Sequence, residues 1–198
     1  MFNLSAMINY AKTLINDFIS TVYPSNCLNC SEILVKNEEY LCTGCLLGLP
    51  RTDYHKDGDK PLDILFVHNQ FIEEAFCFLH FSQGGVAQRL LHQLKYKNRP
   101  GVGVFVGGIY AQDLLNIDLA YDLILPVPIH WKKIKKRGYN QSDYIADGMS
   151  QVLDLPVFKD CLLKSSYGTS QTKKSKVERW QNVASTFKVQ KPTQLMGK

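Results

Sequence analysis

The fold class of this chain follows most directly from Asp122-Leu-Ile-Leu-Pro-Val-Pro-Ile-His-Trp-Lys-Lys-Ile-Lys-Lys-Arg-Gly-Tyr-Asn-Gln141. An apolar run that ends at two prolines is typical of a buried strand leading into a loop. This loop carries five cations within six residues, turns at Gly138 and enters a helix that we expect over residues 139–153. In open α/β sheets, ligands bind beyond the carboxyl ends of the strands, where a helix N-terminus offers free N–H groups to an anion. The stretch therefore predicts an α/β fold with a phosphate-binding loop, and a merely solvent-exposed basic loop is the alternative.

Helical and strand-like patterns alternate along the neighbouring sequence. We expect helices over residues 86–97 and 102–115, and strands over residues 64–67, 75–81, 122–128 and 183–189. This alternation predicts a parallel sheet with helices on both faces. The glycines between residues 101 and 108 match a dinucleotide-binding fingerprint poorly, because they follow a turn and have the wrong spacing, so we expect them to serve helix packing.

Four cysteines form two Cys-x2-Cys pairs, Cys27 with Cys30 and Cys42 with Cys45, separated by eleven residues. Each pair can turn two thiolates toward one point, and two pairs complete the tetrahedral shell of a structural zinc ion. Zinc would stabilise a segment too small to fold alone, by on the order of 10 kcal/mol. A redox-active pair and disulfide bonds are the alternatives, and a reducing compartment makes disulfides the weaker of the two.

Composition divides the chain into four segments. We expect an amphipathic helix within residues 1–25, a zinc module over 26–49, a polar linker over 50–61 and the α/β domain over 62–198. No run of eighteen apolar residues suggests a membrane span, and polar residues interrupt the first helix as they would not in a secretion signal. These patterns predict a cytoplasmic protein.

Positive charge gathers toward the C-terminal end. From residue 126 onward the chain holds 14 Lys and Arg against five Asp and Glu. Such a bias indicates an anionic partner, namely phosphate, nucleotide or nucleic acid, although a solvated lysine-rich face has a similar composition. The polar, basic segment over residues 165–182 is long for a loop without structure of its own, and we expect it to close as a lid over a phosphorylated substrate.

Taken together, these motifs resemble those of the ComF family, the competence protein F group of phosphoribosyltransferase-like proteins. The resemblance rests on the paired cysteine motifs, Leu94-Lys95-Tyr96, Pro126-Val-Pro128, Arg137-Gly-Tyr-Asn-Gln141 and Gln171…Arg179-x2-Asn182…Phe187. These pieces follow in order over nearly the whole chain. The Pro-Val-Pro and Arg-Gly-Tyr-Asn-Gln motifs are the most specific part.

The resemblance implies a type I phosphoribosyltransferase fold behind a zinc module, related to glutamine amidophosphoribosyltransferases. It implies phosphoribosyl pyrophosphate with Mg²⁺ as the ligand, and a link to DNA uptake in natural transformation, with DNA-uptake proteins as partners. The implied ligand-binding residues are Pro128, Lys132, Lys133, Lys135, Lys136, Arg137, Gly138, Asn140 and Gln141, the last two steadying the loop from the helix start. Gln171 and Arg179 would belong to the catalytic lid.

Family members continue into a strand and a loop with two adjacent acids, two threonines and a glycine, which holds the ribose hydroxyls and the 5-phosphate. The sequence ends before such a loop and contains no Asp-Asp pair. We therefore expect a truncated chain without turnover. A zinc-containing module that binds single-stranded DNA is the alternative function, since Trp131 and Tyr139 flank the basic loop and could stack on bases. A non-catalytic scaffold whose first helix docks on a partner ranks third.

Overall fold

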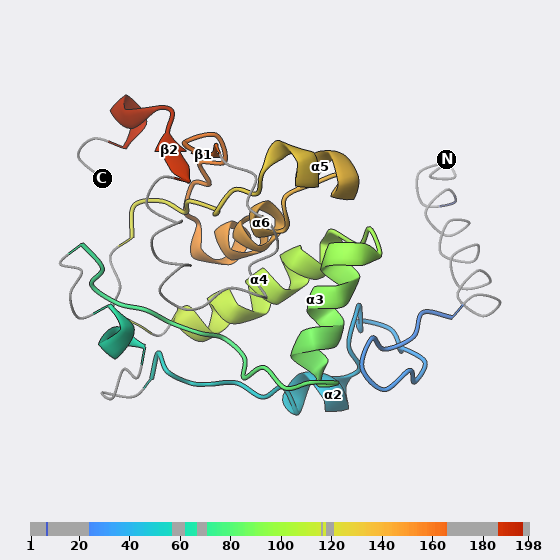
Figure 1. Ribbon diagram of the computed structural model, residues 1–198. Coiled ribbons are helices and arrows are strands. Elements are labelled where there is room, and N and C mark those ends of the chain that lie inside the picture. Colours follow the sequence, from blue (N-terminus) through green and yellow to red (C-terminus); the bar gives the residue numbers. More distant parts are fainter. Residues whose placement is uncertain are drawn as a thin grey trace. The chain divides into compact units, whose positions relative to one another are not determined.

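The computed structural model describes Met7 and residues 24–56, 62–66, 71–115, 117, 121–165 and 186–195 (Figure 1). The chain divides into two compact units, residues 1–50 with 81–90 and residues 51–80 with 91–198. The helix expected within residues 1–25 lies outside the described residues, apart from Met7. Within the described ranges, no helix is both long and apolar enough to cross a membrane.

The first unit contains the four cysteines and the start of a helix far along the chain. Its elements are α2 (Thr43–Leu47), one antiparallel bridge between Asn26 and Ile33, and the first half of α3 (Val86–Tyr96). The buried apolar side chains of this unit are Cys27, Leu41, Leu49, Val86, Ala87 and Leu90. Because three of the six come from α3, the cysteine segment shares its small core with that helix.

The second unit is built on two helices that pack against each other, α4 (Gly101–Leu114) and α6 (Gln141–Leu153) (Figure 1). A Cβ added to Gly107 would lie less than 3.0 Å from the carbonyl oxygen of Ile145, and one added to Gly148 less than 3.0 Å from that of Val104. Each helix thus places a glycine where the other helix's backbone passes. This confirms the packing role for Gly107, and Gly103 is similar, since a Cβ added there would lie 2.9 Å from that of Tyr144.

Strand structure among the described residues is small. Strands β1 (Leu162–Lys164) and β2 (Phe187–Val189) pair antiparallel, with Leu162 opposite Val189 and Lys164 opposite Phe187. A single parallel bridge joins Ile124 to Val157, supported by backbone hydrogen bonds of 2.9 and 3.0 Å. The described part of the chain therefore combines helices with little strand, and its one parallel contact falls in the apolar run before the basic segment.

Three expected strands do not form, those over residues 64–67, 75–81 and 122–128, and the last of these has only the isolated bridge at Ile124. The helices expected over residues 86–97, 102–115 and 139–153 are confirmed within two residues of their bounds. Residues 64–67 were expected to form a strand, but Asp63–Leu65 is a 3-10 helix, η1, and Ile64 and Leu65 are 76% and 62% exposed, so no burial favours a strand. Residues 75–81 are extended with one antiparallel bridge, between Leu79 and Arg51. The expected strand over 183–189 forms at Phe187–Val189, and residues 183–185 lie outside the described part. A second 3-10 helix, η3, covers Pro192–Gln194.

Candidate metal centre and anion-binding segment

The four thiols of Cys27, Cys30, Cys42 and Cys45 converge on one point. Their Sγ atoms all lie within 4.8 Å of one another, and those of Cys30 and Cys42 are 3.6 Å apart. Four sulfurs at about 2.3 Å from a tetrahedral zinc ion stand about 3.8 Å from each other. The cluster therefore has the donor set and the spacing of a structural zinc site, and it can hold such a metal ion. All four cysteines are free thiols, at distances too long for a disulfide bond.

Backbone hydrogen bonds shape the two cysteine turns. The N–H of Cys27 donates to the carbonyl of Glu32 at 2.8 Å, and the N–H of Leu46 donates to that of Cys42 at 2.9 Å. The Glu38 carboxylate accepts from the Val35 N–H at 3.0 Å and from the N–H and hydroxyl of Thr43 at 2.6 and 2.7 Å. These bonds, from Val35 first and then Thr43, lower the pKa of Glu38. Glu38 thus joins the segment between the pairs to the start of α2, a role that the sequence analysis missed.

The protonation of the thiols is consistent with a cation site. Burial acts to raise the pKa of Cys27, but hydrogen bonds from the backbone N–H groups of Cys30, Cys42 and Asn29 outweigh it and lower that pKa to about 6. At Cys30 a backbone hydrogen bond from Glu32 is outweighed by desolvation and by the neighbouring sulfurs, which raise the pKa to about 12. Neighbouring thiolates repel one another, so only a cation among them allows all four to ionise together.

The basic segment is a helix, which corrects the expected loop. Residues Trp131–Arg137 form α5, and Gly138 ends it in the left-handed conformation with φ of 86°. Lys and Arg are good helix formers, and Lys135, Lys136 and Arg137 lie in the last turn, where the helix dipole favours cations. The turn at Gly138 is confirmed, and the next helix begins at Gln141 instead of residue 139.

His130 caps the start of α5. Its Nδ1 accepts a hydrogen bond from the backbone N–H of Lys132 at 3.2 Å, and the side chain is buried. Burial lowers the pKa of His130, and the neighbouring ammonium groups of Lys132, Lys164 and Lys133 lower it further. A neutral imidazole therefore starts the basic helix.

Asn140 and Gln141 brace the turn between α5 and α6, and both are buried. The Asn140 amide donates to the carbonyl of Val127 at 3.2 Å, while its oxygen accepts from the Ser142 N–H at 3.4 Å. Gln141 accepts from the Arg137 guanidinium at 2.9 Å. The guanidinium also lies 5.5 Å from the centre of the Tyr96 ring. Asn140 and Gln141 thus connect the start of α6 to the segment before α5 and to its last residue.

The first turn of α6 contains an acidic residue of the same helix. Asp143 lies in the first turn and accepts a hydrogen bond from the Asn140 amide at 2.6 Å. Burial raises the pKa of Asp143, although the bond from Asn140 acts in the opposite direction. Because this carboxyl group already complements the helix dipole, the start of α6 offers less positive charge to an external anion than α5 does.

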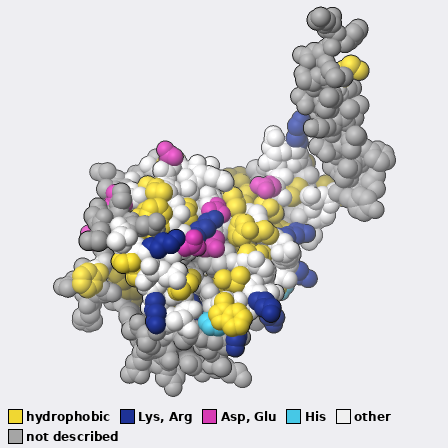
Figure 2. All heavy atoms as spheres, turned by 90° about the horizontal axis from the view of Figure 1, so that it is seen from above, with side chains coloured by type: hydrophobic (Ala, Val, Ile, Leu, Met, Phe, Trp, Pro, Cys, Tyr) yellow, Lys and Arg dark blue, Asp and Glu magenta, His cyan; other side chains and the backbone are white. Residues whose placement is uncertain are grey.

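The cations of α5 have few anionic neighbours. Among the described residues, no carboxylate forms an ion pair with Lys133, Lys135 or Lys136. Lys132 places its ammonium 5.6 Å from the centre of the exposed Trp131 ring. Figure 2 views the molecule from above, where α5 lies, and shows Lys and Arg side chains around a histidine and an exposed hydrophobic side chain. This face can attract a multiply charged anion.

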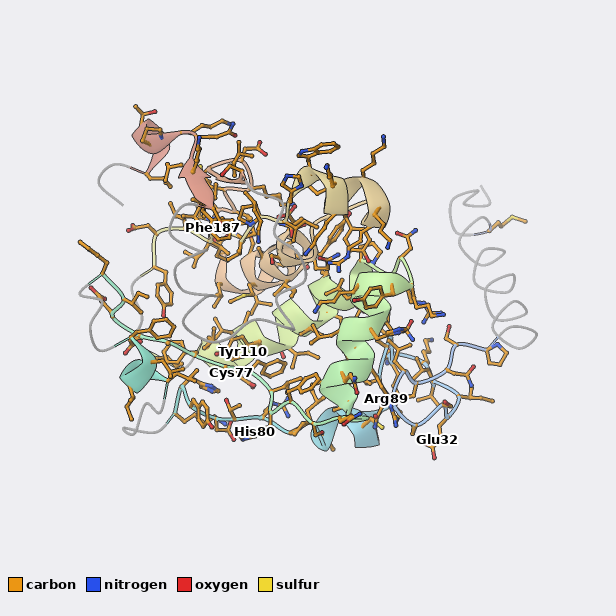
Figure 3. All side chains as sticks on the ribbon, in the orientation of Figure 1. Glu32, Cys77, His80, Arg89, Tyr110 and Phe187 are labelled. Atoms are coloured by element: carbon orange, nitrogen blue, oxygen red, sulfur yellow. The ribbon has the colours of Figure 1, made fainter. Side chains whose placement is uncertain are left out.

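Lys164, at the end of β1, is a further cation that the sequence analysis did not single out. Its pKa is lowered by burial and then by Lys133. Its ammonium lies 5.2 Å from the centre of the Phe187 ring, which Figure 3 labels on β2. Lys164 also contributes to the lowered pKa of His130. Lys164 is distant from α5 in the sequence, and only the fold brings the two close together.

The remaining predicted residues are distributed as follows. Pro128 and Gly138 lie on either side of α5, and Gln171 and Arg179 lie outside the described residues. Comparisons with known protein families, with curated proteins and with solved structures found no match.

Proposed function

We propose that this chain is a ComF-like, phosphoribosyltransferase-type protein that binds phosphoribosyl pyrophosphate along α5 and carries structural zinc in its four-cysteine centre. The observation that carries the proposal is the bracing of α5. Buried Asn140 and Gln141 fix both the segment before this helix and its last residue. A basic helix held this firmly, in which Lys133, Lys135 and Lys136 form no ion pair with a described carboxylate, is suited to hold a pyrophosphate group in a fixed place.

The parallel bridge between Ile124 and Val157 supports the proposed sheet. It joins the run before α5 to the run after α6 through a helical crossover, as in a parallel α/β unit. In such a sheet, α5 follows the carboxyl end of its strand, which is where ligands bind. The complete parallel sheet is part of the proposal.

In this role the cations of α5 neutralise the pyrophosphate as it departs from the anomeric carbon, and catalysis comes mainly from positioning and charge stabilisation. Mg²⁺ would arrive bound to the pyrophosphate oxygens. Among the residues that the structure describes, the four cysteines are the group that could hold a metal ion, and their thiols suit zinc and not Mg²⁺. The proposed place in DNA uptake rests on the family resemblance alone.

The test is calorimetric titration of the chain with phosphoribosyl pyrophosphate and Mg²⁺ at moderate salt. We expect binding that weakens at least tenfold when Lys132, Lys133 and Lys136 are all changed to Gln, because each charge-assisted hydrogen bond contributes about 1.5–3 kcal/mol. The matched control changes Lys36, Lys95 and Lys188 to Gln, which removes the same net charge elsewhere. No binding by the unaltered chain, or equal losses in both triple variants, would contradict the proposal.

Binding of single-stranded DNA is the second candidate, and the exposure of Trp131 favours it. The indole is 60% exposed and lies beside Lys132, so a base could stack on the ring while lysines follow the phosphates. Trp131→Ala separates the two functions. It should weaken DNA binding by about 1–3 kcal/mol for one lost stack, and leave sugar-phosphate binding nearly unchanged. DNA affinity should also fall steeply with salt.

A further inference from the structure

Asn29 lies between the two ligands of the first cysteine pair and contacts a sulfur of the second pair. Its side-chain amide donates to the Sγ of Cys45 at 3.2 Å. One residue between two ligands of the first pair thus reaches a ligand of the second pair as well.

Arg89 fixes Asn29 from α3. Its Nη1 donates to the backbone carbonyl of Asn29 and, at 3.0 Å, to the side-chain Oδ1. Figure 3 labels Arg89 on α3 beside the segment that carries Glu32. Holding Oδ1 orients the amide so that its N–H group points toward Cys45. The three residues therefore form a chain of hydrogen bonds from Arg89 through Asn29 to Cys45.

The hydrogen bonds from Arg89 through Asn29 to Cys45 can offset negative charge at a metal centre. Four thiolates around a zinc ion leave two excess negative charges. An N–H group that donates to a thiolate withdraws part of that charge, and a guanidinium nearby offsets more of it. The helix neighbours of Arg89, namely Val86, Ala87 and Leu90, are buried and belong to the same unit. Their burial keeps this part of α3 in place.

We propose that Asn29 and Arg89 are outer-sphere positioning residues of the metal centre, and that this centre therefore extends from the cysteine segment to α3. Asn29 tunes the sulfur of Cys45, and Arg89 sets the orientation of Asn29. The inference rests on the proposed zinc binding by the four cysteines and is independent of what α5 binds.

The test measures metal affinity in the full chain by competition with a chelator of known affinity. Outer-sphere partners typically contribute about 10–100-fold to metal affinity, so we expect losses in that range for Asn29→Ala and Arg89→Met. Arg89→Lys keeps the charge and one donor and should lose less. Lys95→Met removes a cation from the last turn of the same helix and should stay within about twofold of the unaltered chain.

Asn29→Asp separates the two links, because it keeps an acceptor for Arg89 but has no N–H group for Cys45. In cobalt-substituted protein, loss of that N–H raises the energy of the sulfur lone pair. The thiolate-to-cobalt absorption band should therefore move to longer wavelength in Asn29→Asp and Asn29→Ala. A purely structural role for Asn29 would not shift this band. The Asn29→Ala/Arg89→Met double variant should lose less affinity than the product of the single losses, since both act on one sulfur.

The outcomes distinguish this inference from the metal site itself. If the unaltered chain binds neither zinc nor cobalt, the metal centre and the inference both fail. If it binds them and the Asn29 and Arg89 variants keep its affinity and its cobalt spectrum, only the inference fails. If Arg89→Met does not fold, the metal affinities and cobalt spectra of Arg89→Lys and Asn29→Asp test the inference in its place.

Discussion

The side-chain amide of Asn140 donates to the backbone carbonyl of Val127 at 3.2 Å. This bond ties the start of α6 to the proline-flanked segment that leads into α5. The same side chain caps α6 and donates to Asp143. One buried side chain therefore makes three hydrogen bonds next to the basic helix.

Replacing Asn140 by Ala should lower the free energy of unfolding by about 1–2 kcal/mol, because the helix cap and a buried hydrogen bond are both lost. Chemical denaturation measures this difference. Gln151→Ala, at an exposed position of the same helix, is the control and should change stability by less than about 0.5 kcal/mol. Equal effects of the two substitutions would show that Asn140 does not brace this region.

Two adjacent glycines of α4 should respond to alanine in opposite directions. Gly107→Ala forces a Cβ against the backbone of Ile145 and should destabilise the protein by about 3 kcal/mol. At Gly108 the nearest atoms lie 3.8 and 4.0 Å away, so alanine fits and should stabilise the helix by about 0.5–1 kcal/mol. Thermal melting of both variants tests the close crossing of α4 and α6. A harmless Gly107→Ala would disprove that crossing.

His130 should make stability fall in mildly acidic solution. Its pKa in the folded chain lies below the ordinary value of 6.5 because of burial and of Lys132, Lys164 and Lys133. The unfolded chain therefore binds a proton first, so this contribution to stability is present above about pH 6.5 and is lost as the pH falls toward the folded-state pKa. Denaturation at several pH values, compared with His130→Asn, measures it; the variant should lose this part of the pH dependence. Pyrophosphate bound to α5 should raise the pKa of His130, which NMR titration can follow.

Lys164 should contribute to anion affinity although it lies outside the basic segment. Its lowered pKa reflects burial and the nearby Lys133, and an anion between the two would relieve their repulsion. Lys164→Met should weaken pyrophosphate binding about tenfold, as expected for one charge-assisted hydrogen bond. Lys188→Met, on the neighbouring strand β2, is the matched control and should bind as the unaltered chain does. If both variants bind alike, Lys164 does not belong to the anion site.

Local patterns predicted the features that depend on local interactions. Helix α3 follows from apolar periodicity, and the four-cysteine cluster follows from spacing. The basic segment was predicted as a loop because the prolines that end the apolar run are typical of a loop, and two residues that support a helix there were not recognised. His130 caps its start and Gly138 closes its end.

Long-range partners could not be predicted in this way. Arg89 meets Asn29 across 60 residues of sequence, and Lys164 meets α5 only through the fold. The expected strand over residues 64–67 failed for the same reason, since an apolar run forms a strand only where a partner and a buried face exist. Ile64 and Leu65 are both exposed in the structure.

The division of α3 between the two units has a practical consequence for dissecting the molecule. A recombinant piece that stops at residue 50 lacks Arg89 together with Val86, Ala87 and Leu90. A piece that starts at residue 51 keeps that helix but loses the cysteine segment, so these three apolar side chains, which belong to the cysteine unit, would face solvent and favour aggregation. Neither unit is thus a contiguous stretch that can be excised intact, and isolating the cysteine unit would require grafting residues 81–90 back onto it.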